Sequence, residues 1–395
     1  MPILGSVDPN GKTGPVGPGT QQFLANTSPF NYLVFFENLA TATAPAQQVV
    51  VTDQLDTSTL DLSTFSLGPI SFGGVTLTPP AGLKQFSAGV DLRPSNNLIA
   101  KVDAALNAAT GLITWRFTSL DPSTEQLTTD ATAGFLPPDV TPPQGEGQLL
   151  YTITPKSGMA SGTTICNQAT VTFDANAPIS TPNWCNTLDT LPPVSQVQAF
   201  PATEPAASFT VQWSGTDAGS GIQYFTIYVS DNGGAFTVWL ANTTATQATF
   251  TGVNGHTYGF YSIARDLVGN VEGPKTAAEA LTTVSTVTLL SAAQVSTTAS
   301  GLVYSRVSQT FNGTATVTNI SGATISGPFQ MVLTSLTSGV TLRDATGTFK
   351  GSPYITVPSV SALAPGQSAT VNLQFSDPSN VKISFTPVIY SGGLN

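Results

Sequence analysis

Two cysteines, Cys166 and Cys185, have a spacing that suggests a covalent bond. If 163–173 and 179–188 form a hairpin around the turn 174–178, the two cysteines lie opposite each other on adjacent strands. A cross-strand disulfide would close a loop of about 20 residues and contribute about 3 kcal/mol in the chain-entropy model. Two free thiols are the alternative, because a single pair in 395 residues fits either reading. The spacing and context favour the disulfide.

Catalytic chemistry has few candidate residues. The sequence has one histidine, His256, and it lies in the turn-like segment Val253-Asn-Gly-His, where a structural role is expected. No G-x-S-x-G, H-E-x-x-H or metal-spaced His/Cys pattern occurs. A carboxylate-pair glycosidase would need closely placed acids. The acidic groups are Asp53, Asp56 and Asp61, and Asp121, Glu125 and Asp130; all lie in segments rich in Pro, Ser and Thr, where capping and solvation explain them. We therefore expect no enzymatic activity.

Tryptophans are the candidates for sugar binding, because sandwich modules that bind carbohydrate display flat aromatic side chains. Of the four, Trp115 and Trp239 could form surface platforms. The alternative is that each packs against its own sheet, which is the commoner fate of a strand tryptophan.

Composition narrows the possible partners and the location. The formal net charge is −10, from 12 Lys and Arg against 22 Asp and Glu, with no basic run. Such a chain is a poor candidate for nucleic acid or anionic lipid. No apolar stretch approaches the length of a membrane span. Segment 1–15 lacks the basic and apolar regions of a signal peptide, so either a signal was removed or the chain is the C-terminal part of a longer protein. We favour the second reading, because 5–18 looks like a linker within a longer protein.

The elements that would position these residues are strands. Alternation with a period of two recurs throughout, as at Phe209, Val211 and Trp213, at Val371, Leu373 and Phe375, and at Val381, Ile383 and Phe385. No sustained helical stripe occurs, and turn signals separate the alternating segments. The pattern predicts an all-β chain of tandem sandwiches. A Pro-Pro joint at 192–193 and a stretch without aromatic residues at 282–300 divide it into domains 1–191, 192–286 and 287–395.

The middle domain resembles the fibronectin type III family. Seven strands are predicted, at about 194–200, 207–213, 222–229, 235–240, 246–252, 257–264 and 274–283. Trp213 ends the second strand, and the sixth reads Tyr258-Gly-Phe-Tyr-Ser-Ile-Ala264. That family carries a buried Trp on strand B and a Tyr-x-Phe…Ala pattern on strand F, so the resemblance implies a fold and no activity.

The outer domains resemble modules of bacterial surface proteins. The first contains Tyr32-Leu-Val-Phe-Phe-Glu-Asn38, Gln48-Val-Val-Val-Thr-Asp53-Gln-Leu55 and Asn167-Gln-Ala-Thr-Val171. It looks like a conserved repeat domain of unknown function from long surface proteins, with an insertion at about 66–148 that includes a predicted hairpin, 98–105 with 112–120. The third contains Leu363-Ala-Pro-Gly-Gln-Ser368 and looks like the immunoglobulin-like C-terminal modules of large exported proteins.

A calcium site is implied by the fibronectin-like topology, in which loops B–C and F–G lie at one end of the domain. Asp217, Asp266, Asn270 and Glu272 fall in those two loops, beside the Pro-Pro joint. Carboxylate and amide oxygens are ligands that Ca²⁺ prefers. The alternative is that these residues hold tight turns through local hydrogen bonds. Calcium is the one cofactor that the sequence suggests.

An intramolecular Lys–Asn amide is a further option, because such bonds occur in bacterial surface sandwiches. The reaction needs a buried acid beside the pair, and Glu37 with Lys156 and a nearby Asn is the first-domain candidate. The simpler reading is that Glu37 faces solvent at the end of a strand.

These observations together predict a non-catalytic structural or adhesive scaffold, located outside the cell or on its surface. Its partners would be other domains of the same large protein or a surface or matrix component. Two alternatives remain open. One is a carbohydrate-binding accessory region of a secreted enzyme, with glycans as ligands. The other is a filament subunit that donates segment 1–25 to the open sheet edge of a neighbour.

Overall fold

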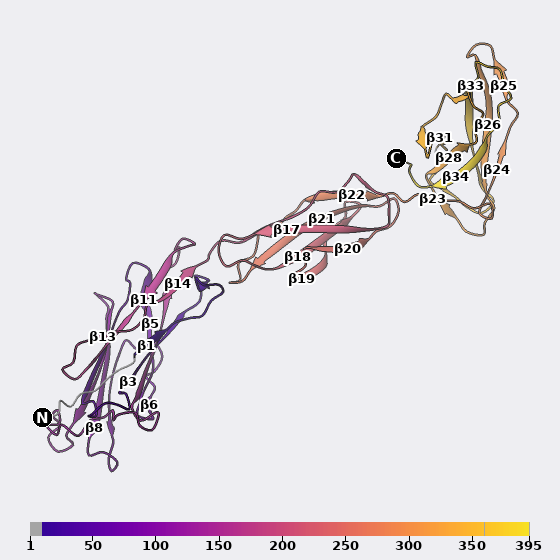
Figure 1. The fold of residues 1–395 in the computed structure, drawn as a ribbon. Coiled ribbons are helices and arrows are strands. Elements are labelled where there is room, and N and C mark those ends of the chain that lie inside the picture. Colours follow the sequence, from indigo (N-terminus) through magenta and orange to yellow (C-terminus); the bar gives the residue numbers. More distant parts are fainter. Residues whose placement is uncertain (1–9, 359, 395) are drawn as a thin grey trace. The chain divides into compact units, whose positions relative to one another are not determined.

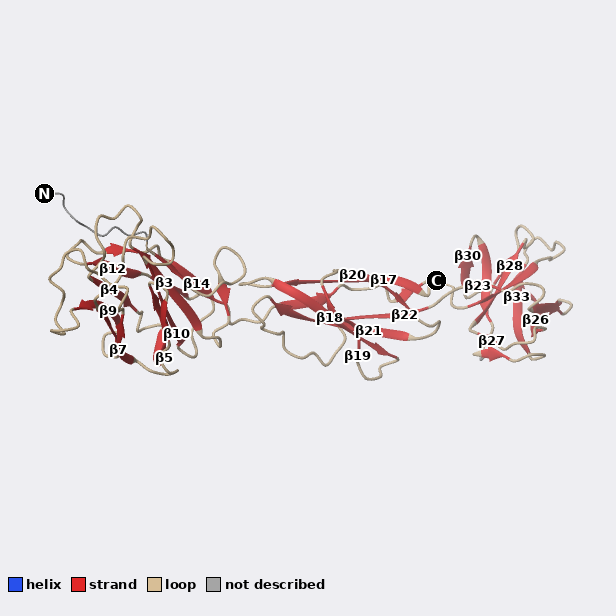
Figure 2. Cartoon of the chain, turned by 90° about the horizontal axis from the view of Figure 1, so that it is seen from below, coloured by secondary structure: helices blue, strands red, loops and turns tan. Residues whose placement is uncertain are grey.

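The chain is built from strands and turns. The computed structural model describes residues 10–358 and 360–394, and in those residues every regular element is a β-strand (Figures 1 and 2). Within this part of the chain, no helix is long and apolar enough to cross a membrane. The predicted fold class is confirmed: the protein is all-β, with tandem sandwiches of the immunoglobulin-like and fibronectin type III-like kind.

The described residues form two compact units. The first contains the residues up to Val194 together with Thr216–Gln223 and Ala264–Gly273, and the second contains Ser195–Gly215, Tyr224–Ile263 and the chain from Pro274 onward. Strand pairing in the described residues stays within three consecutive stretches, which are 11–188, 194–284 and 288–391.

The first stretch forms two large sheets and a small one. The five-stranded sheet has the order β1 (Gly11–Thr13), β3 (Phe30–Glu37), β10 (Glu146–Pro155), β5 (Leu60–Phe72) and β6 (Val75–Leu77). The six-stranded sheet has the order β13 (Ile179–Ser180), β12 (Ala169–Phe173), β4 (Gln48–Gln54), β9 (Leu112–Leu120), β8 (Ile99–Asn107) and β7 (Gln85–Asp91). The small sheet has the order β11 (Thr164–Asn167), β14 (Trp184–Leu188) and β2 (Phe23–Leu24).

Alternation along these strands supplies the core of the first sandwich. In β3 the even-numbered residues from Phe30 to Phe36 are buried, and the residues between them are not. Successive side chains of a strand point to opposite faces, so one face of each sheet is apolar and meets the other sheet. The same period in β4 buries Asp53 after Val49 and Val51. The predicted hairpin within 66–148 is confirmed as the antiparallel pair β8–β9.

The second stretch has the predicted fibronectin-like strands. One sheet has the order β15 (Val194–Val197), β17 (Ser208–Thr216) and β20 (Gln247–Thr251). The other has the order β16 (Thr203–Glu204), β22 (Ala280–Val284), β21 (Thr257–Asp266), β18 (Ile222–Asp231) and β19 (Thr237–Thr243). All seven predicted ranges overlap a strand, and the last strand begins at Ala280 instead of 274. Trp213 is buried and donates its indole N–H to the carbonyl of Ala245 at 2.7 Å.

The third stretch is also a sandwich. One sheet has the order β23 (Thr288–Leu289), β34 (Thr386–Ser391), β28 (Phe329–Thr334), β31 (Ser352–Thr356) and β30 (Gly347–Phe349). The other has the order β24 (Val295–Ala299), β26 (Thr310–Asn319), β33 (Ser368–Ser376) and β29 (Thr341–Leu342), and β25 (Val303–Ser305) pairs with β26. β27 (Ile325–Ser326) pairs with β32 (Ala362–Leu363).

One predicted strand in this domain is wrong. The alternating residues Val381, Ile383 and Phe385 lie in an irregular segment, and β34 starts only at Thr386. Ile383 and Phe385 do pack against the core. The backbone of the segment bonds instead to Thr337, whose hydroxyl accepts the Ser384 N–H at 2.9 Å. The Thr337 N–H also donates to the Ser384 carbonyl at 3.0 Å, so a single residue, mainly through its hydroxyl, takes the place of a strand partner.

The N-terminal segment is used within its own domain. Gly11–Thr13 pairs antiparallel with β3, and Phe23–Leu24 pairs in parallel with β14. A Cβ atom on Gly11 would lie 2.0 Å from the ring of Phe35, so the ring covers this glycine and would have to move for any larger residue. These pairings argue against the filament alternative for residues 10–25, whereas 1–9 lie outside the described residues.

Candidate functional site

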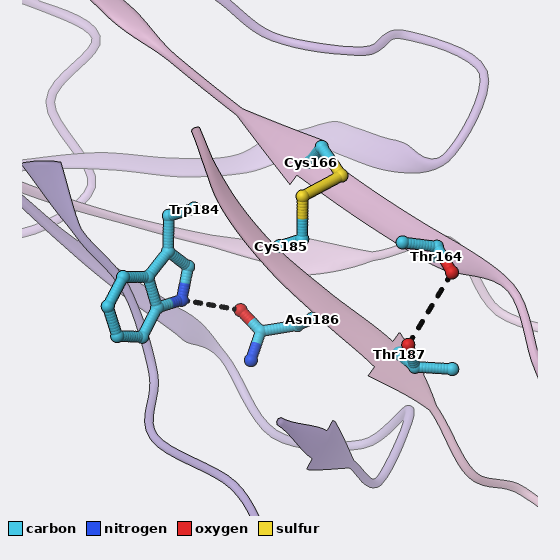
Figure 3. Close-up of a disulfide and its surroundings, with 6 residues drawn as sticks. All are labelled: Thr164, Cys166, Trp184, Cys185, Asn186 and Thr187. Carbon is cyan, nitrogen blue, oxygen red and sulfur yellow. Dashed lines mark hydrogen bonds between the residues drawn. A yellow bond between two sulfur atoms is a disulfide. The ribbon is translucent and has the colours of Figure 1, made fainter. Parts of the chain in front are cut away.

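The two cysteines form the predicted disulfide. Cys166 of β11 and Cys185 of β14 are direct partners in the strand register, with Cα atoms 4.1 Å apart (Figure 3). Cys166 lies on the exposed face of β11, because the residues on either side of it are buried. The bond therefore links two strands at the surface of the first sandwich.

The hairpin that predicted this pairing is correct in its outer half only. Thr164 pairs with Thr187 and Asn167 with Trp184, as expected from the cysteine register. Farther in, Val171 pairs with Ile179, which is one residue out of that register. The shift arises because the chain leaves the small sheet after Asn167 and enters the six-stranded sheet as β12, beside β4.

Strand β14 also fastens the N-terminal segment. The side-chain amide of Asn186 donates to the carbonyls of Pro15 at 2.8 Å and Gln22 at 3.0 Å. Its oxygen accepts the indole N–H of Trp184 at 2.9 Å (Figure 3). A Cβ atom on Gly14 would lie 2.5 Å from that indole, so the segment runs closely across Trp184. The disulfide-bonded strand thus holds the chain directly after β1.

A buried ion pair forms a second polar site in the same domain, and sequence reasoning missed it. The ammonium group of Lys12 bonds to Oδ2 of Asp53, and neither side chain has exposed surface. Lys12 Nζ also donates to the Tyr151 hydroxyl at 2.9 Å and lies 4.7 Å from the centre of the Tyr32 ring. Asp53 was expected in a solvated turn. That expectation is wrong, because the period of β4 turns Asp53 inward.

Tyr151 joins this ion pair to a buried amide. Its hydroxyl donates to Asp53 Oδ2 at 2.8 Å and accepts the side-chain N–H of Asn167 at 2.7 Å. Among the described residues, Oδ1 of Asp53 and Oδ1 of Asn167 are both buried without a hydrogen-bond partner. Native proteins rarely leave buried polar atoms unpaired, so this cluster of Lys12, Asp53, Tyr151 and Asn167 requires an explanation.

Burial shifts the pKa values of Lys12 and Tyr151 in this cluster. Burial lowers the pKa of Lys12 below its usual value of 10.5, and the neighbouring Asp53 opposes part of that shift. Burial, and secondarily the charge of Asp53, raises the pKa of Tyr151 well above its usual value. Tyr151 therefore keeps its proton, and Lys12 loses its proton more readily than an exposed lysine does.

The loops proposed for calcium do bring carboxylates together. Within the first compact unit, Asp189, Asp217 and Asp266 each offer an oxygen, and these oxygens lie within 4.8 Å of one another. Asp189 and Asp266 are fully buried. Among the described residues, Oδ1 of Asp217 has no hydrogen-bond partner. Asp189 was not among the predicted ligands, although it lies only three residues before the Pro-Pro joint.

Most oxygens of this acidic cluster already serve the loops. Oδ1 of Asp266 accepts the backbone N–H groups of residues 268, 269 and 270, at 3.1, 2.6 and 2.7 Å. Oδ2 of Asp217 accepts those of residues 219 and 221, at 3.0 and 2.8 Å. Asp189 accepts the N–H of Ser220 at 2.7 Å. These bonds match the predicted alternative, in which the acids hold tight turns.

The two other predicted calcium ligands, Asn270 and Glu272, make hydrogen bonds in the loops. Asn270 turns its NH₂ group toward Asp266 Oδ2, at 2.7 Å, and also donates to the Asp189 carbonyl at 3.1 Å. Glu272 is absent from the group, and its Oε2 accepts the N–H of Ala264 at 3.0 Å. Glu272 is thus not part of this group, whereas Asn270 contacts it through its NH₂ group, and a role of Asn270 in binding calcium stays a prediction.

The proposed carbohydrate platform is wrong for Trp115, which is fully buried in the core of the first sandwich. Trp239 is partly exposed, and its ring packs against Trp213, Phe250 and Phe260 with centroids 6.3, 5.3 and 5.7 Å away. The two tryptophans belong to different compact units. They provide no common sugar-binding row.

The residues considered for catalysis have structural partners. Within the described residues, the hydrogen bonds of the His256 ring run only to the carboxylate of Asp231, at 2.9 and 3.0 Å. Bonds from Ser123 and Thr132 lower the pKa values of Asp121 and Asp130, respectively. A glycosidase acid needs a raised pKa, so these two carboxyls are poorly suited to that role.

The predicted amide-forming pair is also wrong. Glu37 lies opposite Glu146, at the start of β10, whereas Lys156 follows the end of β10. About ten strand residues, or roughly 30 Å, separate them. Lys156 is exposed and donates to the carbonyl of Thr57 at 2.7 Å. The buried lysine of this domain is Lys12, which the sequence did not suggest as a candidate.

Comparison with solved structures gives β-sandwich proteins. They include the major pilin subunit BcpA of Bacillus cereus (12% identity, TM-score 0.28, 71% of this chain and 70% of that chain). Fibronectin(III)-like modules of Clostridium thermocellum CbhA also match (11% identity, TM-score 0.23, 70% of this chain and 94% of that chain). A collagen-binding domain of a Staphylococcus aureus adhesin matches as well (8% identity, TM-score 0.23, 48% of this chain and 98% of that chain). A search of curated proteins gave no match.

One family model matches part of the chain. It leaves out 83–111, which contains all of β7 and β8 and lies inside the expected insertion. The matched part includes all of the sequence patterns that suggested a surface-protein repeat, from Tyr32 to Val171, and both cysteines. Residues 8–82 and 112–187 thus match the family described as "Domain of unknown function (DUF7619)".

Proposed function

We propose that the chain is a non-catalytic structural part of a secreted or cell-surface protein. The observation that carries this proposal is the disulfide between Cys166 and Cys185, which links two strands at the surface of the first sandwich. Disulfides of this kind persist in oxidising compartments and are rare in the cytosol.

The fold supports a spacing or presenting role. Tandem sandwiches with their own cores are units from which extended proteins are assembled. The surface is polar mainly through uncharged residues, because only 9% of all residues are charged. The partners we propose are further domains of the same protein or a component of the cell surface or matrix. Glycans are less favoured, because Trp115 is buried and Trp239 packs against three aromatic rings.

Localisation and redox state test the proposal together. In cells that produce the natural full-length protein, we expect antibodies against this region to label intact cells or to detect it in the medium. We also expect external protease to remove the surface signal, and both cysteines to resist alkylation until a reductant is added. Detection only inside the cell, with both cysteines alkylated directly, would contradict the proposal.

A second measurement addresses the sugar-binding alternative. We expect no binding of the purified chain to a glycan array. Binding that is lost in Trp239→Ala, but kept in the matched variant Trp184→Ala, would support carbohydrate recognition over a purely structural role.

A further inference from the structure

The buried cluster around Tyr151 contains the groups of an amide-forming reaction. Lys12 supplies an amine, Asn167 a carboxamide and Asp53 a carboxyl group, and all three side chains are buried. We propose that Lys12 and Asn167 become joined by an intramolecular amide bond, and that Asp53 transfers the proton that this reaction requires.

The geometry gathers these groups around one hydroxyl. Oη of Tyr151 contacts Lys12 Nζ at 2.9 Å, Asp53 Oδ2 at 2.8 Å and Asn167 Nδ2 at 2.7 Å. The three reacting residues come from different strands, β1, β4 and β11, so the fold has to form before they meet. Holding reactants together in this way removes much of the entropic cost of a reaction.

The two unpaired oxygens identify the proton arrangement. As an ion pair, the cluster leaves Asp53 Oδ1 and Asn167 Oδ1 buried without a donor. In the proposed reaction one proton passes from Lys12 to Asp53, which leaves a neutral amine, whose lone pair can attack, and a neutral acid. The acid then has an O–H to donate, and Asn167 Oδ1 is a buried acceptor that lacks one. That hydrogen bond would draw electrons from the Asn167 carbonyl carbon.

The reaction balances without any other reagent. The lone pair of Lys12 Nζ attacks Cγ of Asn167, and a Nζ–Cγ bond forms. Asp53 accepts a proton from Nζ and delivers one to Nδ2. The Cγ–Nδ2 bond then breaks and ammonia leaves. The products are a secondary amide and one ammonia molecule, with no oxidant, reductant or cofactor consumed. At the end Asp53 is again the neutral acid that it became when Lys12 gave up its first proton.

Asn167, and not Asp53, is the acyl group that fits this site. An amide between Lys12 and Asp53 would expel water, and a second acid would have to protonate the departing oxygen. The hydroxyl group that contacts Asp53 is that of Tyr151. Burial raises the pKa of Tyr151, so Tyr151 is a poor acid. With Asn167 as the acyl group, Asp53 remains available as the acid.

The bond would connect the ends of the first sandwich. Lys12 lies in the first strand of the five-stranded sheet, and Asn167 lies where the small sheet passes into the six-stranded one. Asn167 also directly follows Cys166, so the same strand would carry two covalent links. Unfolding of this domain would then leave its N-terminal strand attached.

Intact mass of the purified full chain tests the proposal. The protein is reduced and denatured first, so that the disulfide does not contribute. We expect the mass to fall below the sequence mass by one ammonia molecule. Lys12→Arg and Asp53→Ala should have their full sequence masses, whereas the exposed-lysine control Lys156→Arg should still show the loss. A wild-type mass equal to the sequence mass would overturn the proposal, whether or not any variant folds.

Peptide mapping distinguishes the cross-link from other losses of ammonia. Asn-Gly pairs, such as Asn10-Gly11, can also lose ammonia by forming a succinimide, but that product does not join two peptides. After trypsin digestion we expect the segment around Lys12 to be linked to the peptide that follows Lys156 and contains Asn167. A loss that maps to an Asn-Gly pair, or a loss of water that joins Lys12 to Asp53, would overturn the assignment.

Discussion

Lys12 and Asp53 form an ion pair in which neither side chain has any exposed surface. The two residues lie on facing sheets of the first sandwich, in β1 and β4. A buried pair of this kind adds little net stability over an apolar pair, but an unpaired partner left behind is costly. The pair therefore makes the position of the short strand β1 specific.

Removal of one partner should be strongly destabilising. In the background Asn167→Ala, which lacks the acceptor of the proposed cross-link, we expect Lys12→Met to lower the free energy of unfolding by about 3–5 kcal/mol. The cause is the buried carboxylate of Asp53, which loses its cation. Urea denaturation provides the measurement.

Two controls accompany this prediction. Lys156→Met in the same background should change stability by less than about 0.5 kcal/mol, because Lys156 is exposed. Adding Asp53→Leu to Lys12→Met should recover part of the loss. A Lys12→Met variant as stable as its background would show that the pair is not buried as described.

The disulfide should stabilise the first sandwich independently. We expect the double variant Cys166→Ser/Cys185→Ser to be about 2–3 kcal/mol less stable than the oxidised wild type, because the open chain gains entropy when unfolded. Chemical denaturation with and without reductant checks this. Reductant should lower the stability of the wild type toward that of the variant and leave the variant unchanged. If the double variant and the oxidised wild type were equally stable without reductant, the disulfide would not stabilise the domain by constraining the unfolded chain.

Acid should weaken the turn at Asp56. Hydrogen bonds from Ser58, and also from Thr59, lower the pKa of Asp56 below its usual 3.8. The folded state thus binds protons less readily than the unfolded one, so this stabilisation is present above the usual pKa and disappears as the pH falls through the lowered value.

The variant Asp56→Ala tests this pH dependence by comparison with the wild type. Because Asp56 is exposed, we expect Asp56→Ala to lose less than about 1 kcal/mol near neutral pH, and to match the wild type once the pH is below the lowered pKa. Denaturation curves at several pH values measure the difference. A difference that grows toward acid pH would have the wrong sign for this explanation.

The acidic cluster should act as a holder of loops. Asp266→Ala removes the acceptor of three backbone N–H groups, and we expect a loss of about 1–3 kcal/mol. If the carboxylates serve the turns, the wild-type melting temperature should be the same in excess EDTA and in excess Ca²⁺. If excess Ca²⁺ raised the melting temperature of the wild type but not that of Asp217→Asn, the calcium prediction would be supported instead.

Gly11 should control the docking of β1. A methyl group at this position would collide with the ring of Phe35, so we expect Gly11→Ala to cost about 1–3 kcal/mol by displacing that ring or the strand. Gly322→Ala, where a Cβ would meet no atom within 4 Å, is the matched control and should be nearly neutral. Thermal melting compares the two. An equally stable Gly11→Ala would mean that β1 has room to shift.

Local patterns predicted much of the fold. The fibronectin-like strands followed from alternation and turn residues, and the cysteine pairing followed from a short hairpin, because both depend on residues close in sequence. Prediction failed where the partner was not local. Val381, Ile383 and Phe385 alternate like a strand, but their backbone bonds to the side chain of Thr337.

The buried cluster shows the same limit more strongly. The one feature of the sequence that pointed to this cluster was the position of Asp53. It follows Val49 and Val51 at every second residue of β4, and these positions face the core. That period could have predicted a buried carboxylate. Nothing near Lys12 or Asn167 in the sequence indicates which residues they would meet.

The sequence by itself determined the fold class, the strand period and the disulfide, because these depend on residue type and short-range spacing. The tertiary structure alone decided that Lys12, Asp53, Tyr151 and Asn167 share one buried site. It also decided that Asp189, and not Glu272, joins Asp217 and Asp266. The physical reason is that sheet packing brings together strands far apart in the chain, and the alternation of each strand fixes only which residues face inward.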